Sequence, residues 1–225
     1  MKRILRTATG IFLRDARSEF RTWYALGAVL VFALASVFSV GFVLRGGREP
    51  EGKLAAAIAW IIVFFAAITG LSRSFVQEAE AGTEGLLRQS APVEAIWLGK
   101  FLFNFALTGA VVVLCLVLYP GFLGLEVSHP IRLALAGLVG AMSLAGTCTI
   151  LAAMAARANS KATVFAVAAL PVLLPTLVFL TQSTSVCFGA GEISAEARSG
   201  MLLLVSYTGI MTTLSWLLFP VVWEE

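Results

Sequence analysis

The stretch from Ser72 to Lys100, SRSFVQEAEAGTEGLLRQSAPVEAIWLGK, is the longest polar interval in an otherwise apolar sequence. It lies between two apolar runs that are each long enough to cross a membrane. In its first half, apolar and charged side chains fall on opposite sides of a helical wheel with a period of about 3.6 residues. The pattern predicts a short amphipathic helix at a membrane surface.

Glycine and proline divide this predicted helix. Gly82 is expected to break it and Thr83 to be the N-cap of a second piece, with Glu84 in the first turn, where the helix dipole favours an acid. Pro92 is expected to end that piece, because proline disfavours the α conformation in the residue before it. On these residues alone, the segment is either a solvated loop between two spans or a docking platform for a soluble partner.

The composition excludes a soluble protein. Of 225 residues, 59% are hydrophobic and 13% are charged, and the mean hydropathy is +0.93. The apolar runs are continuous rather than alternating, which predicts helices and not a β-barrel. We therefore expect one all-α transmembrane domain over residues 1–225 with six membrane-spanning helices. The predicted spans cover about residues 25–44, 54–71, 101–119, 133–156, 163–180 and 201–222.

The distribution of lysine and arginine predicts the orientation. Eleven of these residues flank the spans on the side of the N-terminus and the polar interval, and five lie on the other side. By the positive-inside rule, both termini and residues 72–100 face the cytoplasm. The net charge of +3 therefore needs no nucleic-acid partner.

Residues 1–23 predict an amphipathic helix in the membrane interface. Five arginines share an arc of less than a quarter turn, namely Arg3, Arg6, Arg14, Arg17 and Arg21. A separate stripe contains Leu5, Phe12, Ala16, Phe20 and Trp23. Such a helix can lie in the lipid bilayer surface with its arginines near anionic headgroups.

Several spans carry packing signals. Small residues recur at every fourth position in the fourth span, at Gly137, Ala141, Ala145 and Thr149, and would let another helix approach closely, within this subunit or across a dimer. Pro171 and Pro175 predict a kink in the fifth span. Asn104 and Thr108 in the third span are expected to hydrogen-bond a neighbouring helix.

Catalytic and ion-coupling groups are missing from the spans. None of the six predicted runs contains Asp, Glu, Lys or Arg, which argues against proton relays and ion-coupled transport. No nucleophile and base are spaced for catalysis, and the three cysteines and single His129 have no metal-ligand spacing. We expect neither an enzyme nor a metal site, so any uphill transport needs energy from a partner.

The polar interval resembles a known class of membrane protein. The run EAEAGTEGLL at 78–87, followed by Ala91-Pro92-Val93 and Leu98-Gly99-Lys100, is similar to the cytoplasmic loop between the second and third spans of type-2 ABC exporter membrane subunits. Within that group, the length, the six spans and LPVLLP at 170–175 most resemble the CcmB family, the haem exporter membrane subunits of cytochrome c maturation.

The resemblance implies a non-catalytic subunit of a bacterial inner-membrane complex. A CcmA-like partner would bind and hydrolyse ATP, and the membrane subunit would couple hydrolysis to haem export or to release of a haem-loaded CcmE-like chaperone. CcmC-like and CcmD-like membrane proteins would complete the complex, with haem as possible cargo and no cofactor bound tightly by this chain. The implied ATPase-coupling residues are Glu78, Glu80, Gly82, Thr83, Glu84, Leu86 and Leu87.

Two alternatives stay open. The chain could be a type-2 ABC permease that exports a lipid, a glycan or a drug, although such permeases usually have longer outward loops. It could also be a membrane scaffold without a transport role. The family motif does not supply His129 as a haem ligand.

Overall fold

The computed structural model describes residues 2–44, 51–71, 82, 87, 89–156, 161–188 and 192–224. Within these residues there are seven α-helices and one short 3-10 helix. They are α1 (Lys2–Thr22), α2 (Tyr24–Leu44), α3 (Gly52–Leu71), α6 (Val93–Leu123), α7 (Pro130–Ala156), α8 (Lys161–Thr184), η1 (Ser185–Cys187) and α9 (Ala195–Glu224). Six of the helices, α2, α3 and α6 to α9, are long and apolar enough to cross a membrane. The prediction of an all-α protein with six spans is confirmed.

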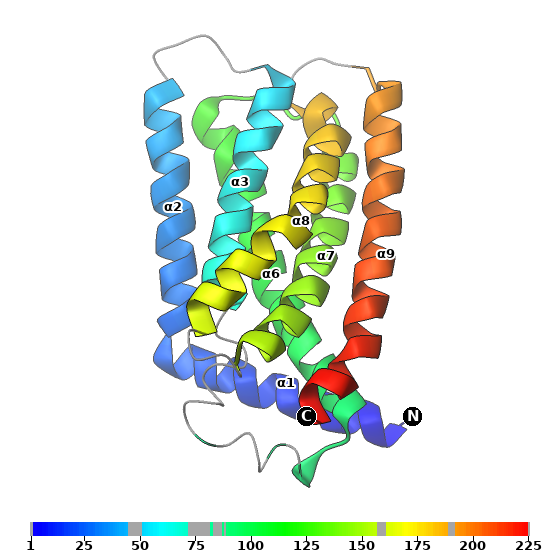
Figure 1. Ribbon diagram of the computed structural model, residues 1–225. Helices are drawn as coiled ribbons and strands as arrows, with labels where there is room; N and C mark the ends of the chain where they lie inside the picture. Colours follow the sequence, from blue (N-terminus) through cyan, green and yellow to red (C-terminus); the bar gives the residue numbers. More distant parts are fainter. Residues whose placement is uncertain are drawn as a thin grey trace.

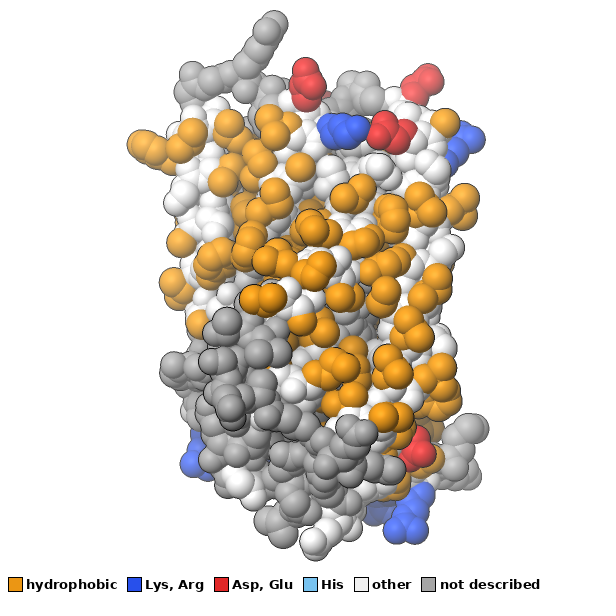
Figure 2. Space-filling view, in the orientation of Figure 1, with side chains coloured by type: hydrophobic (Ala, Val, Ile, Leu, Met, Phe, Trp, Pro, Cys, Tyr) orange, Lys and Arg blue, Asp and Glu red, His pale blue; other side chains and the backbone are white. Residues whose placement is uncertain are grey.

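The six long helices form an up-and-down bundle, and α1 crosses beneath it (Figure 1). The described chain begins in α1 and ends close to it, and we call this end of the molecule the basal end. Figure 2 shows a broad apolar band between charged side chains at the two ends of the molecule. In a bilayer every backbone polar group must be paired within the protein, and a helix does this within its own segment. The chain is a multi-pass membrane protein.

Helix α7 forms the centre of the bundle because its small residues admit close neighbours. In its most apolar window 72% of the residues are buried, against 22% for α2 and for α9. A Cβ atom added at Gly137 would lie 2.9 Å from Val112 of α6, and one at Gly140 would lie 2.8 Å from Leu180 of α8. The small-residue stripe of α7 thus faces other helices of the same chain, with Ala141, Ala145 and Thr149 all buried.

Two helices begin earlier than the sequence predicts. Helix α6 begins at Val93 rather than Phe101, because Pro92 has the extended backbone of an N-cap and its carbonyl accepts the first amides of the helix. Helix α9 begins at Ala195 rather than Met201, with the Ser194 hydroxyl accepting the Ala197 amide. Polar first turns hide both starts from a search for apolar runs.

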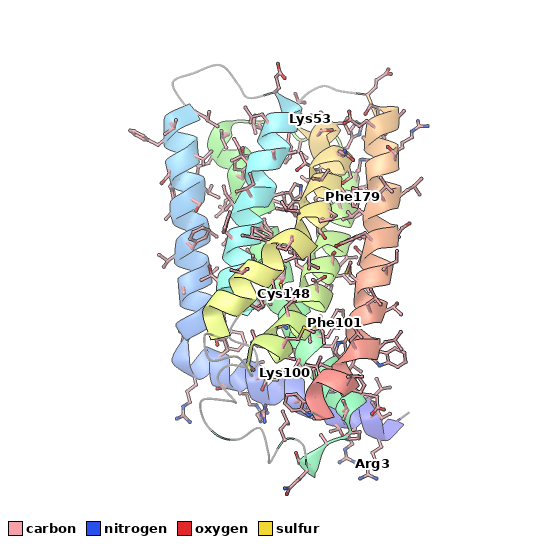
Figure 3. All side chains as sticks on the ribbon, in the orientation of Figure 1. Arg3, Lys53, Lys100, Phe101, Cys148 and Phe179 are labelled. Atoms are coloured by element: carbon pink, nitrogen blue, oxygen red, sulfur yellow. The ribbon has the colours of Figure 1, made fainter. Side chains whose placement is uncertain are left out.

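Several contacts hold the helix ends together opposite the base. Arg132 of α7 donates to the carbonyls of Ser183 on α8 and Ala197 on α9. Lys53 of α3 pairs with Glu196 of α9 at 2.9 Å, and Figure 3 shows Lys53 at this end. The four helices α3, α7, α8 and α9 are therefore tied to one another at this end.

Helix α8 contains both predicted kink residues, Pro171 and Pro175. Its axis changes direction along its length in Figure 1. Proline removes a backbone amide donor and crowds the preceding turn, which bends a helix. The Tyr207 hydroxyl of α9 donates to the Val172 carbonyl, so the bent region is also supported from outside the helix.

Candidate coupling region at the basal end

The predicted coupling residues lie mostly outside the described residues. This applies to Glu78, Glu80, Thr83, Glu84 and Leu86. Gly82 is in a turn with φ +65°, a conformation that glycine adopts readily and that interrupts a helix. Leu87 is helical and buried against the bundle. The described residues that follow this region in the chain are the first turns of α6, and α1 packs on these turns.

Helix α1 packs directly on the start of α6. A Cβ atom added at Gly99 would lie 2.8 Å from the Ile11 Cβ atom and 2.9 Å from the Ala8 carbonyl oxygen. Both α1 residues are buried, with exposed fractions of 1% for Ala8 and 6% for Ile11. Only glycine permits this approach, so α1 and α6 meet backbone to backbone.

An ion pair joins the same two helices. The Lys100 ammonium lies 2.9 Å from one Asp15 oxygen, and the Lys100 side chain is 3% exposed. Arg14 donates to the other Asp15 oxygen at 2.9 and 3.1 Å. Asp15 thus bridges a buried cation of α6 and a half-exposed cation of α1, and Figure 3 shows Lys100 close to α1. A buried charge is tolerated when it is paired, so the pair fixes the register of α1 on α6.

A second acid of α1 secures the corner with α2. The buried Glu19 carboxylate accepts the Leu26 amide at 2.8 Å, near the first turn of α2, where the helix dipole favours a negative charge. Trp23 between the helices has φ +52°, and its amide donates to the Glu19 carbonyl at 2.7 Å. Such a left-handed residue closes a helix, here at a position without glycine. The angle between α1 and α2 is therefore set by specific bonds.

The first turns of α6 also contact α9. The Trp97 indole donates to the Ser215 hydroxyl of α9 at 3.0 Å. The Trp97 ring stacks on Phe101, whose ring stacks on Phe105, with centroid separations of 5.1 and 6.2 Å. The residues that follow the predicted platform are thus held by α1 on one side and by α9 on the other.

The five predicted interfacial arginines all lie on α1 and are exposed. They are Arg3, Arg6, Arg14, Arg17 and Arg21. The apolar stripe divides in two, because Leu5, Phe20 and Trp23 are exposed whereas Phe12 and Ala16 are partly buried. Helix α1 lies across the ends of the bundle, as expected for an interfacial helix (Figure 1).

Polar side chains inside the bundle join neighbouring helices. Asn104 of α6 donates to the Thr149 hydroxyl of α7 at 2.9 Å, which confirms the expected contact of Asn104 with another helix. Thr108 is buried one turn further along α6 without a hydrogen bond from its hydroxyl. Trp60 of α3 donates to Thr184 of α8 at 2.8 Å. These bonds fix the packing of the helices and supply no reactive group.

An apolar groove of about 600 Å³ lies between α6 and α7. Phe105, Leu116, Val117 and Leu138 are among its lining residues, and glycines at 109 and 137 widen it. Aliphatic and aromatic groups of this kind suit an apolar occupant. His129, just before α7, accepts the Leu133 amide with its backbone carbonyl at 3.0 Å and does not line the groove.

Sequence reasoning missed the residues that hold α1 in place. Asp15 and Glu19 are spaced by four positions and lie together on a side of the helix away from the arginines. An acidic pair on its own side of a cationic helix is a signal that this side faces protein. Gly99 also carries a signal of its own, because a glycine in a helix interior costs about 1 kcal/mol and therefore points to a close contact.

The comparisons with known proteins agree on one family. The CcmB protein family model matches residues 6–219. The chain is 29% identical over 190 residues to heme exporter protein B of Rhodobacter capsulatus, an alignment that covers 84% of this chain and 86% of the relative. It is 26% identical over 204 residues to heme exporter protein B of Bradyrhizobium diazoefficiens, covering 90% and 91%. The match includes most of α1, the polar interval, the first five spans and most of α9, and this chain belongs to the CcmB family.

Proposed function

We propose that this chain is the membrane subunit of an ABC transporter in cytochrome c maturation. An ATPase subunit would dock on the coupling segment, residues 72–100, at the part that precedes α6. This part, residues 72–92, is the platform, and ATP hydrolysis by the partner would drive haem export or release of a haem-loaded chaperone. The match of residues 6–219 to the CcmB family model carries this proposal, and the relatives named heme exporter protein B support it. The chain itself would be non-catalytic, with ATP bound by the partner and with both termini in the cytoplasm.

The geometry of the basal end supports a role in coupling. Residues 72–92 are followed at once by the first turns of α6. In these turns Gly99 packs closely on α1 and Lys100 forms an ion pair with Asp15 of α1. A force on the platform would therefore reach α6 and α1 together. Packed elements joined by buried bonds move as units rather than deforming gradually.

The distribution of charge is consistent with an external source of energy. In the described helices α2, α3 and α6 to α9, every Asp, Glu, Lys and Arg lies within the first eight residues or at the last residue of its helix. Ion-coupled transporters place such groups near the middle of the membrane. A partner ATPase supplies what these helices lack.

Charge reversal in the platform tests the proposal. E78K/E80K/E84K should abolish formation of haem-loaded cytochrome c in cells while the partner ATPase keeps hydrolysing ATP in the purified complex. E126K/E192K is the matched control, because both residues are exposed at the end of the bundle opposite α1. It should leave cytochrome c formation and ATP hydrolysis unchanged. Normal cytochrome c formation by the triple variant would instead favour a scaffold that transmits no motion.

A further inference from the structure

Helix α1 has three faces with different surroundings. One face is directed at the bundle and holds Ala8, Ile11, Asp15 and Glu19. A second face carries the exposed arginines. The third is exposed and apolar, with exposed fractions of 52% for Leu5, 48% for Leu13 and 60% for Phe20, and with Trp23 at 57% just after the helix. Among the described residues, the six helices of the bundle bury the first of these faces and leave Leu5, Leu13 and Phe20 exposed.

The outer surface of α1 is strongly cationic. Its two acidic residues, Asp15 and Glu19, are directed towards the bundle, where they bind Lys100 and the α2 amide. Arg14 shares Asp15 with Lys100, which offsets part of its charge. The positive charge of the outer face thus comes mainly from the other four arginines, which lie on one side of the helix.

The apolar face next to these arginines determines which partner fits best. A cationic strip beside an exposed apolar strip, on a helix lying flat at the end of a transmembrane bundle, is the pattern of a helix at a membrane surface. Phosphate headgroups would meet the arginines at the depth where acyl chains meet the leucines and Phe20. Trp23 at the corner with α2 has the side chain preferred at this boundary. A soluble protein would complement the charge but leave the apolar strip uncovered.

We propose that α1 is a binding surface for anionic phospholipids. Arg3, Arg6, Arg17 and Arg21 bind the headgroup phosphates, while Leu5, Leu13 and Phe20 contact the upper acyl chains. Because Asp15 and Lys100 fix α1 on α6, the bound lipid is held beside the turns that follow the platform. The lipid surface is formed by side chains of α1 alone, whatever the cargo of the complex.

Spin-labelled lipids provide a direct test on the full-length protein. The protein is reconstituted in phosphatidylcholine vesicles, and electron paramagnetic resonance measures the immobilised fraction of labelled phosphatidylglycerol or phosphatidylcholine. We expect a preference for phosphatidylglycerol that weakens as salt is raised. R3Q/R6Q/R17Q/R21Q should reduce this preference at least about fivefold, since each basic residue near an anionic surface contributes about that factor.

Three controls keep the test decisive. Lysine at the same four positions should retain most of the preference, because the charge stays. K53Q/R198Q, at the opposite end of the bundle, should leave it unchanged. An unaltered preference in the four-glutamine variant, or its absence in the wild type, would overturn the proposal. Loss of a co-purifying ATPase with unchanged lipid preference would also overturn it, by assigning the arginines to a protein contact.

Discussion

Lys100 of α6 and Asp15 of α1 form an ion pair of 2.9 Å, and the two side chains are 3% and 11% exposed. The pair lies beside the point where Gly99 meets the α1 backbone. The pair lies eight residues after Pro92, where the predicted platform ends and α6 begins. The pair therefore joins the interfacial helix to the bundle at the point where the platform ends.

K100M should destabilise the protein by about 3 kcal/mol, because it removes one partner of a buried charge pair and leaves Asp15 with Arg14 alone. The thermal unfolding midpoint of the purified protein measures the effect. R14Q is the matched control, since the Arg14 side chain is 49% exposed and such pairs contribute about 0–1 kcal/mol. The double variant D15N/K100M should lose less than the sum of its parts. Equal unfolding midpoints for K100M and R14Q would show that the buried pair contributes no more to stability than the exposed one.

G99A should separate α1 from α6, because its Cβ atom would lie under 3 Å from Ile11 and from the Ala8 carbonyl. Hydrogen exchange in α1 should become faster and the unfolding midpoint should fall. In G109A on the same helix, the new carbon meets no atom of another helix within 4 Å, so this variant should stabilise slightly, by about 0.5–1 kcal/mol. If both variants behaved alike, the close contact at residue 99 would be refuted.

E19A should weaken the start of α2 by about 1 kcal/mol, because the Leu26 amide loses its acceptor. E19Q keeps an acceptor oxygen and loses only the charge, so it should cost less. Hydrogen exchange at Leu26 reports the bond directly and should rise most in E19A. As a control, E94A removes an exposed acid from the first turn of α6 and should leave Leu26 unchanged. Unchanged protection of Leu26 in E19A would contradict the assigned cap.

Cysteine labelling tests the orientation of the chain. The three native cysteines are buried, so background labelling by an impermeant maleimide should be low. Glu126 lies beyond α6 at the end opposite the base, whereas exposed Ser90 precedes the basal start of α6. In intact spheroplasts E126C should react, and S90C should react only after lysis. The reverse pattern would place both termini outside.

The sequence predicts the spans well because a long run of apolar residues identifies a membrane helix. Continuous apolar runs locate α2, α3 and α7 to within three residues at each end. Spacing alone also indicates α1, since its arginines and apolar residues separate on a helical wheel. Local patterns are sufficient wherever lipid or water, rather than another part of the chain, decides which side chains are tolerated.

Contacts between distant residues could not be predicted in the same way. Nothing near Lys100 in the sequence indicates that it is buried against Asp15. From the sequence alone, its charge indicates only that this end of the span faces the cytoplasm. The left-handed Trp23 likewise depends on Glu19 bonds that form only when α1 turns into α2. The start of α6 was missed because its first turns carry Glu94 and Lys100, which interrupt an apolar count.

The measurement that tests the central claim most directly is purification of the tagged protein from its native membrane in mild detergent, followed by mass spectrometry of the proteins that accompany it. The proposed function predicts recovery of an ABC-type ATPase together with a tryptophan-rich haem-handling membrane protein. An ATPase alone would indicate a general exporter rather than a cytochrome c maturation complex. Recovery of no ATPase, from a preparation in which other known membrane complexes stay intact, would contradict the proposed function.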